Sequence, residues 1–231
     1  MNPRHHRDEA TLVSRAAGAL SAEMSAVVDT HLDGCAHCRG LLVQAERVGG
    51  TLLMQQQPLD ADAGRVEQLR RQMLERLADN LPPQASVAPL EPRHAPDRLP
   101  RPLRRYFGDS WSTLRWRWVA PGVHMIRAPH TGGDNLILLK IAPGKSMPVH
   151  SHQGAELTQI LKGAYDDELG HFAPGDIADL DNEVEHRPVT SPGVPCICVA
   201  ASDAAAQPVI VCCSTMHRCH NSAANAWRSC A

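Results

Sequence analysis

Three residues near the start of the chain, His31, Cys35 and Cys38, constrain its fold more than any other feature. Their spacings of four and three place the side chains on one narrow stripe of a helix, or at two abutting helix ends. Imidazole nitrogen and thiolate sulfur are the ligands that zinc prefers. A closed tetrahedral site needs a fourth ligand, and the upstream candidates are the adjacent His5 and His6. The pattern therefore predicts a structural zinc site that ties the N-terminal segment to a helical hairpin.

The segment Cys35-Ala36-His37-Cys38 has two other interpretations. One is a redox CxxC pair, but such a pair usually follows a strand within a βαβ unit, whereas residues 8–56 have a helical pattern. The other is a pair of partly buried cysteines without a metal. The spacing favours zinc over both, and it leaves the choice between His5 and His6 open.

The length of 231 residues is enough for two modest domains. A formal net charge of -2 gives no overall attraction to nucleic acid or to an anionic membrane, so we expect no direct contact with either. The first residues lack the apolar segment of a signal peptide, and no apolar run reaches the roughly 18 residues of a membrane span. We therefore expect a cytoplasmic protein whose eight cysteines serve metal or redox chemistry rather than disulfides.

Four segments before residue 82 have the apolar spacing of amphipathic helices. They cover about 8–20, 21–32, 35–53 and 65–81. Asp8 and Ser21 are the expected N-caps of the first two, and Gly34 is placed to end the second. The pair Gly49-Gly50 weakens the middle of the third helix and favours a break or hinge there.

The fourth helical segment carries apolar residues on one face, namely Val66, Leu69, Met73 and Leu77. This face either packs on the preceding helices or forms an exposed stripe for a partner protein. Seven prolines between Pro82 and Pro102 then exclude a regular helix or a central strand. Residues 82–104 are therefore predicted to be a linker.

Beyond Trp111 the pattern changes to short apolar runs separated by glycine and proline, which is typical of an all-β barrel or sandwich. The runs are 123–128, 136–142, 157–161, 196–200 and 209–211. The run from Leu136 to Leu139 is apolar on both faces, so it predicts a central strand. Cys196 and Cys198 alternate, so both thiols are expected on one face of a strand. Either their oxidation contributes to sensing or they are ordinary core residues.

A second group of metal-binding side chains lies in this β region. His150 and His152 are two residues apart, which puts both imidazoles on the same side of a strand. Glu156 follows four residues later, and His186 lies about thirty residues downstream. Three imidazoles and a carboxylate suit zinc or another divalent transition metal.

The segment from Gly144 to Gly163 resembles the first cupin motif at every fixed position. The second cupin motif normally has its histidine two residues after a Pro-x-Gly turn. Here the turn is Pro174-Gly175-Asp176 and His186 comes ten residues later, which makes His186 the weakest member of the ligand set.

The two metal patterns together resemble the ChrR-type zinc-binding anti-sigma factors. The resemblance implies a helical zinc anti-sigma domain over 1–81, the linker over 82–104, and an all-β cupin-like sensor domain, a double-stranded β-helix, over 105–211. It places zinc on four N-terminal residues, His6, His31, Cys35 and Cys38, and so selects His6 over His5. It places zinc or another divalent metal on His150, His152, Glu156 and His186. Residues 212–231, with further cysteines, do not fit the pattern and are expected to form an atypical tail.

The same resemblance implies a function in transcription regulation. The helical domain would sequester an extracytoplasmic-function (ECF) sigma factor in a one-to-one complex, and the cupin-like domain would release it under oxidative stress such as singlet oxygen, without catalysis. The main alternative is a cupin-type metal-dependent dioxygenase with a helical accessory domain, because the same ligand set serves both roles. The N-terminal His/Cys pattern favours the anti-sigma interpretation. A DNA-binding regulator would need a basic recognition helix, and the 65–81 segment alternates basic with acidic residues.

Overall fold

The computed structural model describes residues 3–6, 8–57, 62–79, 96–129, 134–148, 154–180 and 185–203. The chain forms two compact units, one made of Met1–Gly49 with Asp97–Ala231 and the other of Gly50–Pro96. The first unit therefore combines N-terminal helices with the strands. These two units differ from the predicted domains 1–81 and 105–211, because the first unit contains residues of both. The domain ranges stay a prediction.

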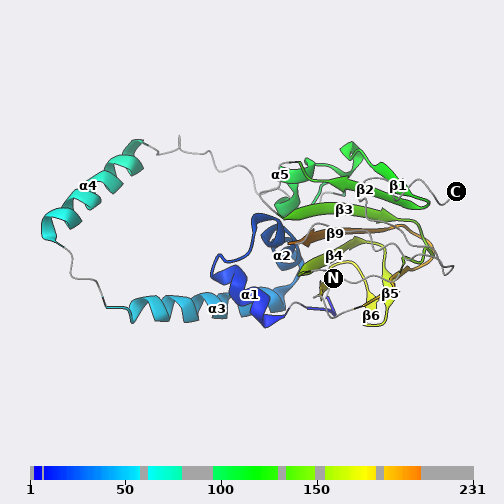
Figure 1. The fold of residues 1–231 in the computed structure, drawn as a ribbon, viewed down its shortest axis with the longest axis horizontal. Helices are drawn as coiled ribbons and strands as arrows, with labels where there is room; N and C mark the ends of the chain where they lie inside the picture. Colours follow the sequence, from blue (N-terminus) through cyan, green and yellow to red (C-terminus); the bar gives the residue numbers. More distant parts are fainter. Residues whose placement is uncertain are drawn as a thin grey trace, which may run out of the picture. The chain divides into compact units, whose positions relative to one another are not determined.

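The N-terminal part is helical, as predicted (Figure 1). It contains α1 (Glu9–Ala16), α2 (Ala22–Gly34) and α3 (Ala36–Met54). Asp8 and Ser21 are confirmed as N-caps, because the side chain of Asp8 accepts a hydrogen bond from the backbone of Ala10 at 3.0 Å and that of Ser21 accepts one from Met24 at 3.1 Å.

Of the predicted break or hinge at Gly49-Gly50, the break is wrong, since α3 runs through both glycines to Met54. The boundary between the two compact units nevertheless falls between them. The second unit contains α4 (Ala63–Asp79). Its apolar stripe is exposed, with Val66 and Leu69 each 48% and Met73 64% accessible.

The strands form two antiparallel sheets. The larger has the order β1-β2-β3-β9-β4-β7, with β1 (Arg117–Ala120), β2 (Val123–Arg127), β3 (Asn135–Ile141), β4 (Glu156–Lys162), β7 (Ile177–Leu180) and β9 (Cys196–Ser202). The smaller has the order β6-β5-β8, with β5 (Tyr165–Asp167), β6 (Gly170–Phe172) and β8 (Val189–Thr190). Four predicted runs coincide with β2, β3, β4 and β9, and β3 is central as predicted. The run 209–211 lies outside the described residues.

Part of the predicted linker is packed. Leu99 and Leu103 are 1% and 0% exposed, and Leu103 ends a short 3-10 turn, η1 (Arg101–Leu103), followed by α5 (Arg104–Phe107) and η2 (Trp111–Thr113). Pro102 fits this turn because proline is tolerated in the first turn of a helix. The prolines thus exclude a long helix without excluding a short turn.

Two apolar clusters lie on opposite faces of the larger sheet. One joins α2 to the outer face and includes Val27, Val28, Leu136, Leu157 and Val199. The other lies between the two sheets and includes Ile160, Tyr165, Phe172, Cys196 and Cys198. The helices and the β domain therefore share one continuous core, which the sequence pattern did not indicate. Within the described ranges, no helix is long and apolar enough to cross a membrane.

Candidate metal centre and its surroundings

The first candidate site brings together side chains from three parts of the N-terminal region. His6 lies before α1, His31 in the last turn of α2, and Cys38 in the first turn of α3. Cys35 is the C-cap of α2, with an extended backbone that turns the chain into α3. The predicted geometry of abutting helix ends is therefore the one observed. The four donor atoms all lie within 4.8 Å of one another.

The distances between these donor atoms fit a tetrahedral zinc ion. His31 Nε2 lies 3.3 Å from Cys38 Sγ, and His6 Nδ1 lies 3.4 Å from Cys35 Sγ and 3.6 Å from Cys38 Sγ. Ideal bonds of about 2.3 Å to sulfur and about 2.0 Å to nitrogen would place neighbouring ligand atoms about 3.5 Å apart. The backbone N–H of Cys38 also donates to Cys35 Sγ at 3.4 Å. The residues present thus fit the metal that their chemistry favours.

Burial and hydrogen bonding orient this cluster. His31, Cys35 and Cys38 are buried, whereas His6 is exposed. His31 Nδ1 lies 2.9 Å from the carbonyl oxygen of Gly175, and a carbonyl can only accept, so this nitrogen carries the proton. The lone pair of Nε2 is thereby directed toward the cysteines, which is the usual arrangement of a metal-binding histidine.

The structure brings His6, and not His5, to the thiols. The ring of His5 stacks on Phe172 with centroids 4.1 Å apart, and its Nε2 lies 3.0 Å from the carbonyl oxygen of His171. Adjacent residues of an extended segment point to opposite sides. Spacing could not decide between the two histidines because the choice depends on which side of the segment faces the β domain.

The second predicted site is described only in part. Glu156 begins β4, and its Oε1 accepts a hydrogen bond from the hydroxyl of Thr158 at 3.0 Å. His186 lies between β7 and β8 and is 5% exposed, with Nδ1 2.9 Å from Oδ2 of Asp167, whose side chain is fully buried. His150 and His152 lie outside the described residues.

Sequence reasoning missed Asp167. A buried carboxylate that accepts the Nδ1 proton of His186 would leave Nε2 as the ligand nitrogen, as is common around metal-binding histidines. Asp167 sits in the run Asp166-Asp167-Glu168, whose composition resembles a solvated turn. The three consecutive acids carry no pattern in the sequence that sets Asp167 apart from its neighbours.

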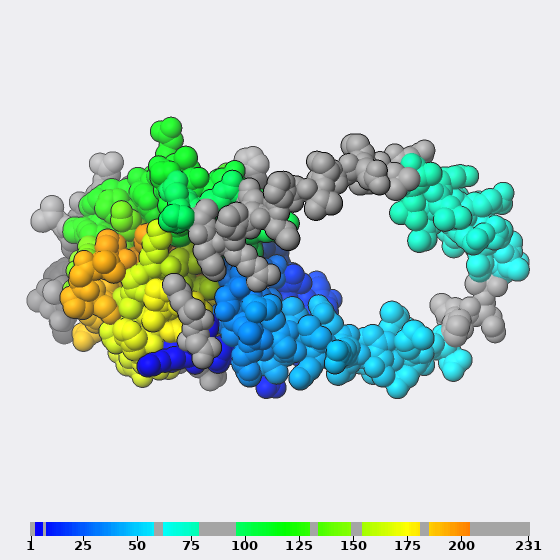
Figure 2. Space-filling model, turned by 180° about the vertical axis from the view of Figure 1, so that it is seen from behind, coloured from blue at the N-terminus to red at the C-terminus, as the bar shows by residue number. Residues whose placement is uncertain are grey.

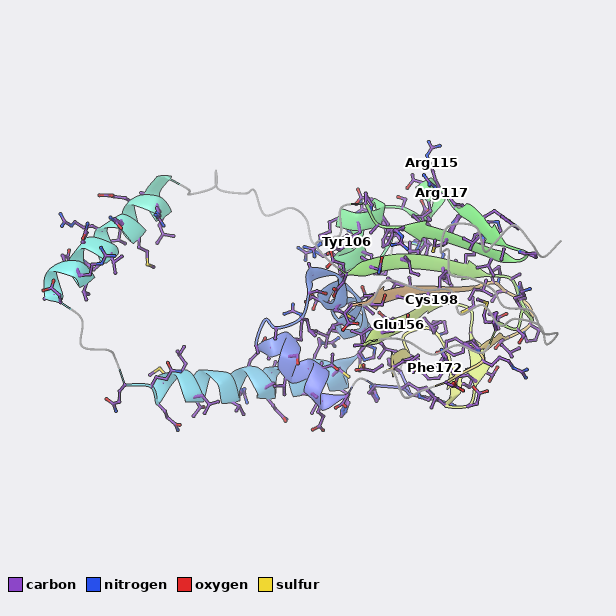
Figure 3. The ribbon with its side chains drawn as sticks, in the orientation of Figure 1. Tyr106, Arg115, Arg117, Glu156, Phe172 and Cys198 are labelled. Carbon is purple, nitrogen blue, oxygen red and sulfur yellow. The ribbon has the colours of Figure 1, made fainter. Side chains whose placement is uncertain are left out.

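The interior of the β domain also contains the second cysteine pair. Glu156 and Cys198 lie on the neighbouring strands β4 and β9 (Figure 3). Register places Cys198 opposite Ile160 and Leu139, and Cys196 opposite Ile141, so the prediction that both thiols share a face is confirmed.

Burial changes the chemistry of that pair. It raises the pKa of Cys196 to about 11, and it raises the pKa of Cys198 as well, with further contributions from Cys196 and Glu156. The pKa of Tyr165 is raised by burial and then by the negative charge of Asp167. These groups are therefore neutral near pH 7, and the thiols are poor nucleophiles.

A His/Cys cluster of zinc type, formed by helices that pack on an antiparallel β domain, defines a zinc-finger protein with an attached β domain. Residues 11–39 match the putative zinc-finger family, and residues 109–206 match the ChrR cupin-like domain family. The anti-sigma-E factor ChrR of Cereibacter sphaeroides is 38% identical over 205 residues, which are 88% of this chain and 92% of that protein. The chain belongs to the ChrR family of anti-sigma factors.

A solved structure supports the same assignment. The crystal structure of Rhodobacter sphaeroides SigE in complex with the anti-sigma ChrR matches with a TM-score of 0.69 and 37% identity, covering 88% of this chain and 100% of that chain. The family supports a regulatory role without catalysis, so the dioxygenase alternative is not favoured. The zinc-finger match and the four-residue cluster together support a zinc site at the N-terminal end.

Proposed function

We propose that this protein sequesters an ECF sigma factor in a one-to-one complex in the cytoplasm and releases it under oxidative stress. One observation carries the proposal: a zinc-type cluster lies in the helical region of a chain 38% identical to an anti-sigma-E factor. The solved complex of a 37% identical relative with SigE supports a sigma factor as the partner class.

The proposed zinc ligands are His6, His31, Cys35 and Cys38. A bound zinc ion supplies cross-linking of chain segments, and such sites contribute folding free energy of about 10 kcal/mol in small domains. The chain's own residues determine which segments are joined: α2 supplies His31, the α2–α3 turn supplies Cys35, and α3 supplies Cys38. The cluster would therefore fix the angle between α2 and α3, and with it the surface offered to a partner.

Exposed apolar side chains provide a docking surface of the expected kind. On α4, Val66, Leu69, Met73 and Leu77 recur at intervals of three or four residues and are 48–64% exposed. On α3, Leu52, Leu53 and Met54 are 59–85% exposed. An amphipathic helix that leaves such a stripe in water is typical of helix-in-groove recognition. We propose that the α4 stripe and the exposed apolar residues at the end of α3 contact the sigma factor.

The β domain would control release. We propose that His150, His152, Glu156 and His186 hold zinc or another divalent metal there, with Asp167 orienting His186 through Nδ1. The buried thiols of Cys196 and Cys198 lie on the same strand surface as Ile160 and remain the second candidate for oxidant sensing. Their low thiolate content at neutral pH argues against direct oxidation by hydrogen peroxide as the first step, because the thiolate is the form that attacks the peroxide.

The decisive experiment measures transcription by RNA polymerase with each ECF sigma factor encoded in the same genome. With the cognate sigma factor, adding the full-length chain should abolish sigma-dependent transcription at one equivalent, and gel filtration should give a one-to-one complex. Failure to bind or inhibit any of these sigma factors would overturn the proposal.

A second arm tests the sensing role. His150→Ala in the full chain should keep sigma binding and lose release under singlet oxygen, and Gln55→Ala, a change at an exposed position of the other compact unit, should keep both. Normal release in His150→Ala would contradict a sensing function of the β-domain site.

A further inference from the structure

The turn between β6 and β7, residues 173–176, makes direct contact with the N-terminal segment 3–6, here called the strap. Asp176 is 2% exposed, and its Oδ1 accepts hydrogen bonds from the backbone N–H groups of Arg4 at 2.6 Å and His5 at 3.0 Å. Its Oδ2 accepts a third from the backbone of Ala173 at 2.8 Å. Bonds to an ionised carboxylate are about twice as strong as neutral ones, so this residue is a firm anchor.

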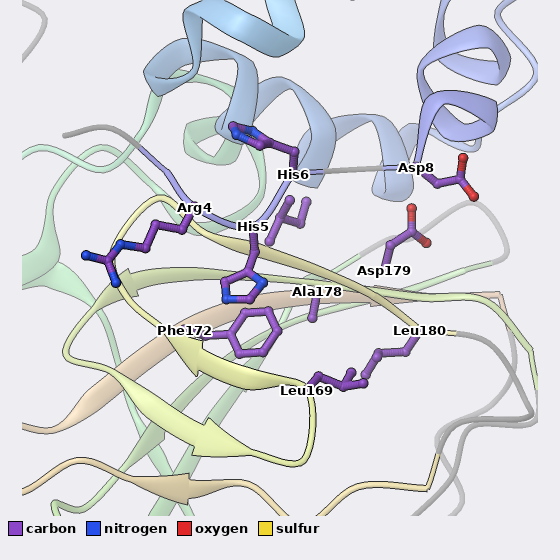
Figure 4. Close-up of a pocket in the computed structure, with 10 residues that line it drawn as sticks. Arg4, His5, His6, Asp8, Leu169, Phe172, Ala178, Asp179 and Leu180 are labelled. Atoms are coloured by element: carbon purple, nitrogen blue, oxygen red, sulfur yellow. The ribbon is translucent and has the colours of Figure 1, made fainter.

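Other contacts continue along the strap. The carbonyl oxygen of His5 accepts a hydrogen bond from the N–H of Ile177 at 3.4 Å. The imidazole ring of His5 covers the ring of Phe172 (Figure 4). Pro3 is buried against Gly175, whose φ of +98° suits glycine and where an added Cβ would lie 3.4 Å from Pro3 Cγ. The first described residues, dark blue in Figure 2, accordingly lie against the β domain.

This turn therefore positions both imidazoles of the proposed zinc site. Asp176 fixes the backbone one and two residues before His6, and the carbonyl of Gly175 receives the Nδ1 proton of His31. The two cysteines are positioned by the helices instead. Half of the donor set thus depends on a turn that belongs to the β domain.

The same turn is bonded to β4. The N–H of Gly175 donates to the carbonyl of Ile160 at 2.9 Å, and the N–H of Ile160 donates to the carbonyl of Asp176 at 3.0 Å. Ile160 lies opposite Cys198 and four residues along β4 from Glu156. A shift of β4 at the interior site would consequently move the 173–176 turn through these hydrogen bonds, and with it the histidines of the zinc cluster.

We infer that Asp176 is a positioning residue for the N-terminal zinc site, through which the β domain sets how tightly zinc is held. The inference rests on the proposed zinc site and adds its regulation. Asp176→Asn leaves one neutral oxygen for the N–H groups of Arg4 and His5, and its amide NH2 group cannot accept the N–H of Ala173. The strap is then held more weakly, and His6 must be ordered at an entropic cost before it can bind. The carbonyl of Gly175 in the same turn is an outer partner of His31, and disturbing such a partner of a metal ligand lowers metal affinity roughly tenfold or more.

The test uses the full-length chain loaded with Co²⁺ alone, because thiolate-to-cobalt absorption reports only a site that contains cysteine ligands. Competition with a chelator gives the affinity of that site for wild type, Asp176→Asn and His5→Ala. Both variants should bind Co²⁺ at least about tenfold more weakly at unchanged band shape. His5→Ala leaves the sequence of the β domain intact and removes the ring contacts of the strap with Phe172 and His171, so it tests the anchoring of the strap where Asp176→Asn fails to fold.

The matched control is Asp166→Asn. Asp166 is an exposed acid on strand β5, and its side chain pairs with the ring of His171 at 2.8 Å rather than with a residue of the strap. This control should bind Co²⁺ like the wild type. Wild-type affinity in both folded Asp176→Asn and His5→Ala would overturn the positioning role alone, whereas a wild-type protein without the thiolate-to-cobalt band would overturn the zinc site as well.

Discussion

The two described cysteine pairs of this protein have opposite surroundings. Cys35 and Cys38 lie 3.3–3.6 Å from imidazole nitrogens at a junction of two helices, whereas Cys196 and Cys198 alternate along a strand inside an apolar cluster. The first environment favours the thiolate once a cation is present, and the second favours the neutral thiol. The comparison teaches that the neighbours of a cysteine, rather than its spacing, decide whether it is a ligand or a core residue.

The largest expected effect comes from replacing one cysteine of each pair by serine. Cys38→Ser should remove bound zinc and abolish sigma binding, because loss of a ligand unfolds a metal-dependent unit. Cys198→Ser should keep the N-terminal zinc and lose stability by about 1–3 kcal/mol, because it puts a hydroxyl into an apolar site. Metal analysis and gel filtration with the sigma factor separate the two. Equal zinc content in both variants would contradict the claim that only the Cys35/Cys38 pair binds metal.

Alkylation of Cys196 should be about two orders of magnitude slower than that of an ordinary exposed thiol. A pKa of about 11 for Cys196, against an ordinary 9.0, lowers its thiolate fraction at pH 8 about 100-fold, and the fraction rises only as the pH approaches 11. We expect slow alkylation of Cys196 in the native protein, and fast alkylation of Cys35 and Cys38 once a chelator is added. Mass spectrometry of peptides gives the rates. Rapid labelling of Cys196 at pH 8 would show that the strand opens.

A smaller effect is expected where neither thiol pair is involved. Met73→Asp on α4 should weaken sigma binding by about tenfold or more with no change in zinc content, because it places a charge in the proposed apolar contact. Gln72→Asp introduces the same charge on the adjacent face of α4 and serves as the control. Calorimetric titration with the sigma factor measures both, and equal affinities would exclude this stripe from the interface.

The smallest effect concerns the helix that carries His31. Ser21→Ala removes the N-cap of α2 and should lower the free energy of unfolding by about 1 kcal/mol. Ser14→Ala, whose hydroxyl only donates to the carbonyl of Ala10 within α1, should change it less. Urea unfolding measures the difference. A loss of zinc in Ser21→Ala would mean that the metal site is less stable than its short donor distances indicate.

Features that depend on local chemistry could be predicted from the sequence. The caps Asp8 and Ser21, the helical hairpin around Cys35 and the central strand 136–139 follow from spacing and residue type, and each agrees with the structure. The shared face of Cys196 and Cys198 follows from the alternation of a strand.

Features that depend on long-range packing could not be predicted in this way. The choice of His6 over His5, the contact of Asp176 with the strap and the pairing of Asp167 with His186 join residues 19 to 172 positions apart. The short strands β5, β6 and β8 have two or three residues each, which is too few for a hydrophobic period to appear.

The continuous core between α2 and the larger sheet has a practical consequence for anyone who dissects this protein. Val27 and Val28 are fully shielded, and they belong to the same cluster as Leu157 and Val199 of the sheet. A polypeptide truncated after α3 would expose this apolar surface of α2 to water and should self-associate. In assays of sigma-factor capture by the isolated helices, non-specific hydrophobic binding would then be mistaken for specific binding of the sigma factor.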